Sequence, residues 1–500
     1  MNTDKKRVAI IGAGLGGLSC AVCLAAKGYR VEIFEKNSHL GGKLNQLESQ
    51  GFRFDMGPSI LTLPQYFRSV FARAGKSFDD YVTLVPVAPH WRNVFEDGTV
   101  IDLESDLTKL QKQLKDRNVQ WETQYNEIKN FLRYSEEQYD VIEAGYFRKD
   151  LEWLWPFVRH YGLRTLGKKI DYKVSMSQRI QEKISNPYFR DIFEFFIKYV
   201  GSSAHNAPAY MNLMPTIQQR YDLWYVEGGL FQLSKAFESL LLELGVSIHT
   251  NTGIQKIVTK GKKVKGLEDQ FGRFHSFDVI VSNMEVAPTY EKLLGQKRMA
   301  QKCIKKFEPA CSGLVIHIGT NQHYPQLAHH NFFYAQNQSA HFAQVFDRYQ
   351  LPSDPTLYVV AASRTDSSVC PADHDNIKIL PHIPYLSKTN PFSDRDYQQL
   401  KEKVYVKLER MGLKDLRKHI KYEHVWTPHD IETQYNSTLG SIYGVVTDWK
   451  KNRGFKNRRK SSRYQGLYFV GASTNPGGGM PMVVLSGQHT ADAISPHQNK

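Results

Sequence analysis

The feature that most constrains this chain is a glycine-rich turn between two predicted strands near its N-terminus. Residues 7–12, RVAIIG, are typical of a buried strand, and residues 15–28 are typical of a helix that ends at Gly28. Residues 30–35, RVEIFE, alternate as a second strand does. A strand, a helix and a strand in this order form a βαβ unit, so the chain is predicted to have an α/β fold.

The turn reads GAGLGG, which has the spacing of a dinucleotide-binding loop. Gly12 permits the tight turn, Gly14 lets the backbone approach a pyrophosphate, and Gly17 lets the helix pack closely on the strand. The helix N-terminus adds free N–H groups and the positive end of its dipole. Glu35 closes the second strand, where an acid accepts hydrogen bonds from ribose hydroxyls. A glycine-rich turn without a nucleotide is the alternative. The residues predicted to bind the nucleotide here are Ile11, Gly12, Ala13, Gly14, Leu15, Gly16, Gly17, Glu35 and Lys36.

The segment after the second strand favours FAD over NAD as the nucleotide. It reads HLGGKLNQLESQGFRFDMGPSIL, an extension that a plain NAD dehydrogenase does not need. Gly42 and Lys43 offer a backbone donor and a cation for a second phosphate contact. Gly57 and Pro58 belong to a turn that we expect to meet the flavin. The alternative is an ordinary surface loop.

The far end of the chain carries a third glycine-rich segment, YFVGASTNPGGGMPMVVLSGQ. A predicted strand leads to Gly471, and a predicted helix follows the glycines. The N-terminus of that helix is expected to face the flavin edge that gains negative charge on reduction, which its dipole stabilises. The candidate cofactor contacts here are Gly471, Met480, Pro481 and Met482, and Ile254, in a predicted strand pair, completes the set.

Two kinds of segment alternate along the chain and suggest its domains. Residues 105–200 are helical in pattern and rich in aromatic and charged residues, whereas strand–helix–strand patterns return from Trp224. We predict a Rossmann-like FAD-binding domain, similar to those of glutathione reductase and amine oxidases, with an inserted mixed α+β domain for the substrate and the membrane. The predicted cofactor domain comprises residues 1–100, 215–300 and 430–500, and the inserted domain comprises residues 101–214 and 301–429.

The apolar run at residues 8–26 follows a basic cluster and therefore resembles a signal peptide or a membrane span. Glycine at the density of GAGLGG is unfavourable in a membrane helix and suits a strand–turn–helix. No other stretch approaches the ~20 apolar residues of a span. We therefore expect a cytoplasmic protein, peripheral on the inner face of the cell membrane.

The net charge of +15 favours an anionic partner, either nucleic acid or acidic lipid. A basic run at 450–463, KKNRGFKNRRKSSR, is expected to be exposed. No sequence pattern of an RNA-binding or zinc-finger module is present, so a nucleic-acid partner is not predicted. No metal is predicted either, because adjacent histidines such as His329 and His330 rarely bind one ion. The CxxC pair Cys20 and Cys23 falls inside an apolar helical pattern and is expected to pack in the core.

The order and position of the three glycine segments resemble the carotenoid desaturase and oxidase family of flavoproteins over the full length. The segments LWYVEGG, YPQLAHHNFF, MGLKDLRKH and NPGGGMPMVVLSGQ resemble the branch of that family that contains the 4,4'-diaponeurosporene oxygenases. Desaturases of the phytoene type usually read THPGAGIPG in the last segment, where this chain has NPGGGMPM.

The resemblance implies oxidation of the terminal methyl group of an acyclic C30 carotenoid, 4,4'-diaponeurosporene or 4,4'-diapolycopene, to an aldehyde with FAD and O2. Loss of hydride from this allylic methyl leaves a delocalised cation, so a flavin needs no metal or acid–base partner. No catalytic residue is predicted. Apolar residues at 187–225 and 312–334 are candidates for a substrate tunnel. A desaturase on the same scaffold is the nearest alternative, and an amine oxidase is another.

Overall fold

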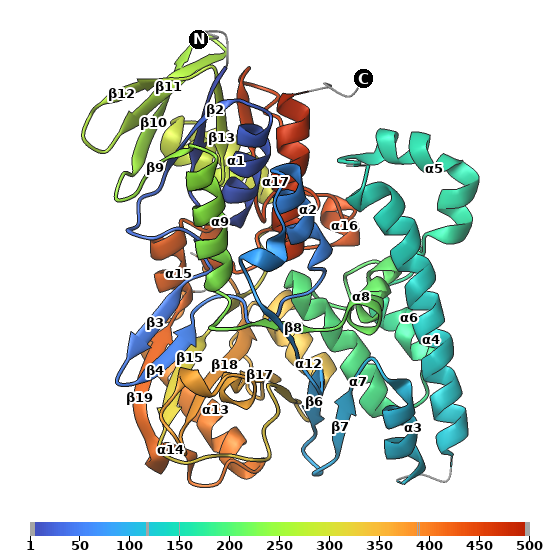
Figure 1. Ribbon diagram of the computed structural model, residues 1–500. Helices are drawn as coiled ribbons and strands as arrows, with labels where there is room; N and C mark the ends of the chain where they lie inside the picture. Colours follow the sequence, from blue (N-terminus) through green and yellow to red (C-terminus); the bar gives the residue numbers. More distant parts are fainter. Residues whose placement is uncertain (1–5, 117–119, 150, 388, 390, 496–500) are drawn as a thin grey trace.

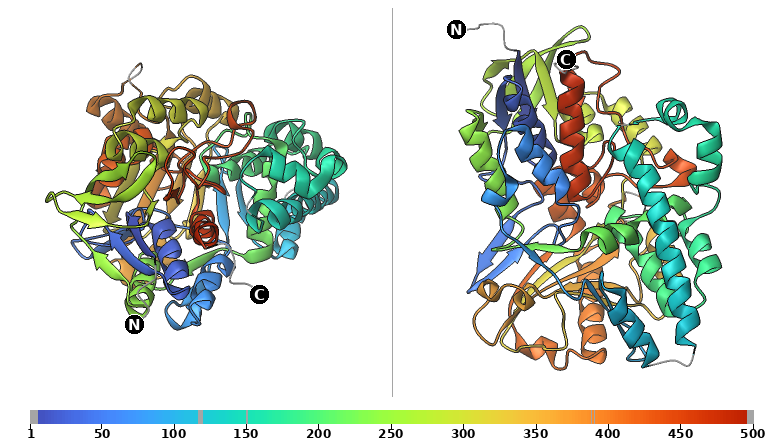
Figure 2. Two further views of the ribbon diagram at one scale, coloured as in Figure 1. Left: turned by 90° about the horizontal axis from the view of Figure 1, so that it is seen from above. Right: turned by 45° about the vertical axis from the view of Figure 1, so that its right-hand side comes forward.

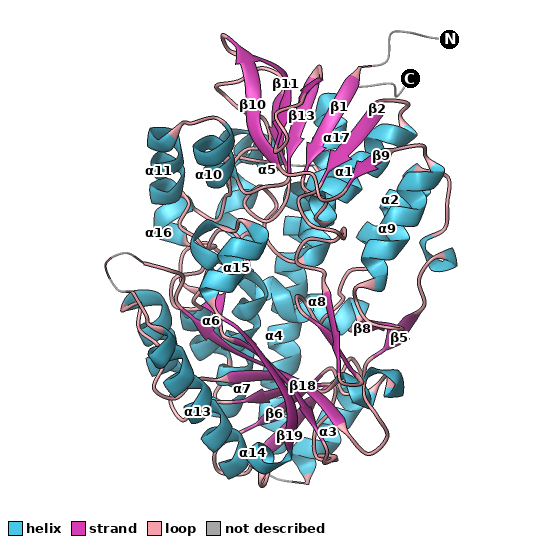
Figure 3. Cartoon of the chain, turned by 90° about the vertical axis from the view of Figure 1, so that its left-hand side faces the viewer, coloured by secondary structure: helices cyan, strands magenta, loops and turns pink. Residues whose placement is uncertain are grey.

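The computed structural model of the protein describes residues 6–116, 120–149, 151–387, 389 and 391–495. Two sheets lie at opposite ends of the molecule, a parallel one beside both chain termini and a larger one at the far end (Figure 1, Figure 3). A layer of helices runs along one side and spans much of the distance between them (Figure 2).

The first sheet is parallel and contains the predicted βαβ unit. Its five strands are, in order, β20 (Leu467–Phe469), β13 (Val279–Ser282), β1 (Arg7–Ile11), β2 (Arg30–Phe34) and β9 (Ser247–His249). Helix α1 (Leu15–Ala26) connects β1 to β2 and packs against α17 (Met480–Ile494) and α9 (Gln232–Glu243). The α/β fold predicted from the alternation of strand and helix patterns is confirmed.

Helices α1 and α17 touch through their backbones. A Cβ atom added to Gly487 of α17 would lie 2.5 Å from the carbonyl oxygen of Gly16 in α1, so only glycine permits this approach. Gly17 lies against the carbonyl of Gly12 in the same way. Cys23 is buried in this region, and burial raises the pKa of its thiol to about 12. The expected core role of the CxxC pair is confirmed.

The second sheet has eight strands. Some of them pair with the next strand in the sequence, and others pair with strands that are far away in the sequence. The strands of the sheet are β19 (Ile420–Trp426), β15 (Val315–Thr320), β18 (Asp375–Ile383), β17 (Leu357–Val360), β16 (His330–Phe333), β6 (Trp91–Val94) and β7 (Val100–Leu103), with β14 (Ser312–Gly313) beside β18. All pairs are antiparallel except β16 with β6.

The division into domains stays a prediction, but the pairing of β6 differs from its expected place in the cofactor domain. Residues 91–94 hydrogen-bond with β16 of the second sheet, and β7 continues that sheet. A boundary would therefore fall before Trp91 and not at residue 100. Nothing in the local sequence indicates this, because a strand pattern does not say which distant strand will be its partner.

The predicted helical segment is confirmed and forms the side layer of the molecule. Its helices are α3 (Leu107–Lys115), α4 (Trp121–Ile142), α5 (Leu154–Lys169), α6 (Met176–Lys183) and α7 (Pro187–Phe195), and α8 (Met214–Tyr221), beyond the predicted segment, continues the layer. A core of aromatic side chains joins this layer to the second sheet: the ring centres of Trp91 and Phe196 are 4.1 Å apart, and those of Trp91 and Phe332 are 4.5 Å apart. Such rings bury large apolar areas and fix the distance between the layers.

The remaining elements connect and cover these layers. They include the sheet of β10 (Ile254–Lys260), β11 (Lys263–Asp269) and β12 (Phe274–Ser276), the pairs β3 (Gln46–Ser49) with β4 (Phe52–Asp55) and β5 (Leu84–Pro86) with β8 (Trp224–Val226), and the helices α2 (Gln65–Arg73), α10 (Val286–Pro288), α11 (Lys297–Lys306), α12 (Gln338–Phe342), α13 (Asp394–Arg410), α14 (Leu416–His419), α15 (Pro428–Tyr435) and α16 (Trp449–Asn452).

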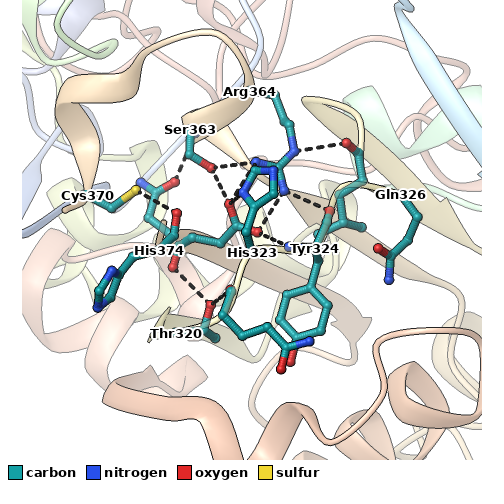
Figure 4. A network of polar contacts seen from close by, with 12 residues as sticks. Thr320, His323, Tyr324, Gln326, Ser363, Arg364, Cys370 and His374 are labelled. Carbon is teal, nitrogen blue, oxygen red and sulfur yellow. Dashed lines mark hydrogen bonds and ion pairs between the residues drawn. The ribbon is translucent and has the colours of Figure 1, made fainter. Parts of the chain in front are cut away.

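A buried carboxylate fastens one end of the second sheet. Asp375, at the start of β18, is fully buried and accepts from Arg364 Nη1 at 2.8 Å and Nη2 at 2.7 Å. Ser363 Oγ donates to it at 2.9 Å, and the Tyr324 backbone N–H donates at 2.7 Å (Figure 4). Arg364 also donates to the carbonyl of Leu327 at 3.0 Å. This network joins residues 324–327 to Ser363, Arg364 and Asp375, which lie 36 or more residues further along the chain.

Candidate functional site

A cavity of about 460 Å³ extends from the glycine-rich turn of the parallel sheet to the face of the second sheet. Its walls come from both sheets, from the helical layer and from the start of α17. The predicted cofactor residues that line it are Ile11, Gly12, Gly14, Leu15, Glu35, Lys36, Gly42, Lys43, Gly57, Pro58, Ile254, Gly471, Met480, Pro481 and Met482. Ala13, Gly16 and Gly17 do not line it and support the turn from behind. Contact of any of these residues with FAD stays a prediction.

The nucleotide end of the cavity is a groove walled by backbone. Gly14 and Gly41 form a β-bridge, and a Cβ atom on Gly42 would lie 3.1 Å from the Gly14 Cα. Any side chain here would close the groove, so the glycines fit a chain of phosphates that must touch the backbone. Glu35 stands beside this groove, where its carboxylate accepts from the Ala13 N–H at 2.7 Å and the Asn37 N–H at 2.9 Å. These bonds fix the orientation of the Glu35 carboxylate beside the groove.

Asn283 is a part of this groove that the sequence analysis did not identify. It follows β13, and its Oδ1 accepts from the Gly17 N–H at 3.1 Å. A Cβ atom on Gly14 would collide with its amide nitrogen. A signal was present, because FDVIVSN at 277–283 has the pattern of a buried strand, and ligand sites gather at the carboxyl ends of parallel strands. Strand β1, which pairs with β13, is 271 residues away in sequence, so the sequence did not show that the two strands are adjacent.

Lys43 lines the cavity, but its amine is already engaged. It donates to the carbonyls of Ser441 at 3.0 Å and Ile442 at 3.1 Å, and burial lowers its pKa. The amine of Lys36 donates to the carbonyl of Thr433 at 2.9 Å. Both amines therefore tie the strand–loop region to the segment that leads to the C-terminus, and neither points freely towards a phosphate as the sequence analysis expected of Lys43.

The loop at residues 55–58 is held from both sides of the molecule. The Asp55 carboxylate accepts from the backbone N–H groups of Leu230 at 2.9 Å and Phe231 at 3.2 Å, at the start of α9. Lys378, from β18, donates to the carbonyl of Asp55 at 3.1 Å and also to that of Gly57. Burial lowers the pKa of the Lys378 amine to about 8. The second sheet thus positions a loop of the nucleotide-binding part.

Helix α17 begins at the cavity, with Gly479 before it at φ +95°. Its first residues, Met480 to Met482, line the wall, so its unpaired N–H groups and positive dipole end face the interior. This is the arrangement expected from the sequence. It favours a group that gains negative charge, such as a reduced flavin.

The rest of the cavity is lined mainly by apolar and aromatic side chains. From the helical layer these are Tyr199, Val200, Tyr210, Met211, Leu213, Met214 and Ile217, and from the sheet side they are Val315, Tyr358, Leu380 and Trp426. Of the segment 187–225, predicted to form a substrate tunnel, residues between 198 and 218 line the cavity. The prediction for 312–334 was wrong except at Val315, because the other inward-facing residues of the sheet belong to β17, β18 and β19.

His329 and His330 do not converge on a common point. The Nδ1 atom of His329 lies 2.6 Å from the Thr365 hydroxyl, and that of His330 lies 3.0 Å from the Tyr358 hydroxyl. Within the described part of the chain, histidine, cysteine and acidic side chains nowhere gather in a group of three that could hold a metal ion.

Comparison with known proteins extends this picture. The family model described as flavin containing amine oxidoreductase matches residues 15–495. Among curated proteins, the chain is 49% identical to 4,4'-diapolycopene oxygenase of Methylomonas sp and 46% identical to 4,4'-diaponeurosporene oxygenase of Staphylococcus aureus (strain USA300), in each case over 99% of both chains. The fold is similar to that of an oxidoreductase from Methanosarcina mazei, with a TM-score of 0.64, 15% identity, and coverage of 97% of this chain and 100% of that one. The resemblance inferred from the motifs is confirmed.

Proposed function

Because this chain belongs to the family described as flavin containing amine oxidoreductase, we propose that it uses FAD and O2 to oxidise the terminal methyl group of an acyclic C30 carotenoid to an aldehyde. One observation supports the proposal: a single cavity is lined at one end by glycine backbone and over the rest mainly by apolar and aromatic side chains. The names of the two curated relatives supply the substrate class and the reaction.

When bound, FAD would supply the acceptor for the hydride that leaves the carotenoid end, and in its reduced form the two electrons that convert one atom of O2 to water while the other enters the terminal carbon; the overall change, R–CH3 + O2 → R–CHO + H2O, then balances. The glycine segments and Glu35 would hold its ADP half, and the start of α17 would lie against its ring. The protein's own task is then to orient the polyene and to exclude water. Val315, Leu380 and Trp426 provide such walls, since apolar side chains hold a hydrocarbon without orienting dipoles towards it. A proton-transfer group is not required for the first hydride loss.

The expected product is a terminal aldehyde that contains oxygen from O2. The purified protein, incubated with a C30 carotenoid under ¹⁸O2 and analysed promptly to limit exchange with water, should give labelled aldehyde by mass spectrometry. Boiled protein is the control. Products that are only more unsaturated hydrocarbons would favour a carotenoid desaturase, the second candidate on this scaffold.

We also propose that the protein binds peripherally to an anionic membrane, because a C30 hydrocarbon must be drawn from a bilayer. In the described residues, no helix is both long enough and apolar enough to cross a membrane. The surface that supports binding lies at the start of α5, where Trp153 is 40% exposed and Trp155 is 68% exposed. The guanidinium of Arg458 lies 4.7 Å from the centre of the Trp153 ring. Tryptophan beside basic side chains is typical of membrane interfaces.

The basic run at 450–463 is only partly exposed, which corrects the sequence analysis. Lys456 is buried and donates to the carbonyls of Val445 at 2.8 Å and Val446 at 2.6 Å. Arg459 is buried against Glu152, with 3.3 Å between Nη2 and the carboxylate. Local sequence does not show this, because the loop folds back on the segment that leads to α17. The exposed basic residues of the run are Lys450, Lys451, Arg453, Arg458, Lys460 and Arg463.

Liposome flotation tests this surface. Replacing Lys450, Arg453, Arg458, Lys460 and Arg463 with Gln should lower the apparent affinity for anionic vesicles at least about tenfold, since each contributes about 1 kcal/mol near such a surface. The matched control replaces five exposed basic residues around α14 and β19, at the end of the molecule that holds the second sheet (Figure 1): Lys403, Lys414, Arg417, Lys418 and Lys421. Equal losses in both variants would show that net charge, and not this surface, governs binding.

A further inference from the structure

One lysine in the cavity wall lies inside a cage of aromatic rings. Lys198 belongs to the short helix Phe196–Val200 of the helical layer and is 6% exposed. Its Nζ atom lies 3.9 Å from the ring centre of Tyr358, 4.0 Å from that of Phe332 and 4.6 Å from that of Trp91. These rings come from three strands of the second sheet. The amine is therefore enclosed by apolar faces on the sheet side.

Lys198 differs from the other buried lysines of the cavity wall. Lys43, Lys378 and Lys456 each donate to two backbone carbonyls. Lys198 has no hydrogen bond or ion pair to any residue that the structure describes. Burial lowers the pKa of its amine well below the ordinary value, and no carboxylate offsets the shift. A neutral amine both donates and accepts a hydrogen bond.

A second polar group without a partner lies next to it. The Tyr199 hydroxyl and the neighbouring Trp91 indole N–H are both buried, and neither makes a hydrogen bond of full geometry with the described residues. Burial raises the pKa of the Tyr199 hydroxyl, so the hydroxyl keeps its proton. Tyr199 also lines the cavity, and its backbone carbonyl would lie 3.8 Å from a Cβ atom on Gly479. The backbone at Tyr199 therefore lies beside the loop that precedes α17, where the flavin ring is expected, and both side chains belong to the wall of the same cavity.

These two groups conflict with a hydrocarbon ligand and suit an oxygenated one. A buried polar group without a hydrogen bond costs about 1–3 kcal/mol. A methyl end of the polyene leaves both groups unsatisfied, whereas a hydroxyl or carbonyl oxygen accepts from either of them. The oxidation of –CH3 to –CHO must pass through the oxidation level of –CH2OH, so an oxygenated end arises in the proposed reaction itself.

We propose that Lys198 and Tyr199 form the binding site for the oxygen atom of a partly oxidised carotenoid end, a primary alcohol or its aldehyde. This inference rests on the proposed function and deepens it. The site retains the alcohol formed by the first oxidation and presents its carbon for the second. The rings of Trp91, Phe332 and Tyr358 position the amine, and Lys198 and Tyr199 thereby determine how far the terminal carbon is oxidised.

The test compares Lys198→Met and Tyr199→Phe with the wild-type holoenzyme. With a C30 carotenoid and O2, the ratio of alcohol to aldehyde should rise at least about tenfold in Lys198→Met, which corresponds to about 1.4 kcal/mol, and by less in Tyr199→Phe. Lys235→Met is the matched control, because Lys235 is an exposed lysine whose amine lies 5.6 Å from the Phe231 ring centre. An unchanged ratio in Lys198→Met overturns the inference.

Two further measurements separate this role from a structural one. The melting temperature of Lys198→Met should not fall, because the change removes an unpaired buried amine; a marked fall together with an unchanged ratio would identify a structural lysine. Anaerobic binding of a C30 alcohol and of its parent hydrocarbon, followed by tryptophan quenching, should show a preference for the alcohol that Lys198→Met loses. If wild-type protein forms no oxygenated product, the proposed function fails, and the binding comparison still decides whether the oxygen site exists.

Discussion

A Gly14→Val variant is expected to purify without the yellow colour of a flavin, with less than about one tenth of the wild-type flavin content. Gly14 has φ −73° and ψ 166°, which valine adopts freely, so the backbone itself is not strained. The loss comes from space: the added side chain fills the groove between Gly14 and Gly42 and meets the amide of Asn283. The measurement is the ratio of flavin to protein absorbance after purification.

A second variant distinguishes flavin loss caused by a blocked groove from flavin loss caused by general misfolding. Gly14→Val combined with Asn283→Ala relieves the collision with the amide but leaves the valine in the groove. This double variant should fold, as judged by circular dichroism and a cooperative melting curve, and should still lack flavin. Full flavin content in either variant would show that the cofactor does not pass over Gly14.

An Asp375→Ala variant should lose about 3–5 kcal/mol of unfolding free energy, the usual cost of removing one partner of a buried ion pair. Arg364 would keep a side chain that is 15% exposed and would lose both of its bonds to the carboxylate (Figure 4). The Ser363 hydroxyl and the Tyr324 N–H would lose their acceptor as well. The measurement is urea denaturation, which gives the free energy of unfolding from the midpoint and slope.

Asp79→Ala is the matched control for this effect. Asp79 also accepts from two nitrogens of one arginine, Arg68, from Nε at 3.0 Å and 3.2 Å and from Nη2 at 2.8 Å, but its side chain is 53% exposed. Water replaces the lost partner there, so the expected loss is below about 1 kcal/mol. If the two variants were equally destabilised, burial of the Asp375 network would not be what holds the end of the second sheet.

The sequence alone determined the βαβ unit, the helical segment, and most of the residues that line the nucleotide end of the cavity. These features are local: strand and helix periodicities repeat over a few residues, and the turn at Gly12 and Gly14 demands residue types that few other structures require. The C-terminal glycine segment was predictable for the same reason. It lies at the start of α17, as expected.

Only the tertiary structure decided which distant residues complete the site. Asn283 lies beneath the glycine turn because β13 pairs with β1, and Lys198 faces rings on β6, β16 and β17 because the helical layer packs on the second sheet. It also decided that Lys456 and Arg459 of the basic run are buried. A periodicity reports which side of an element is apolar, but it does not report which partner covers that side. Partner choice depends on packing and pairing between segments hundreds of residues apart, and this is the information that the fold adds.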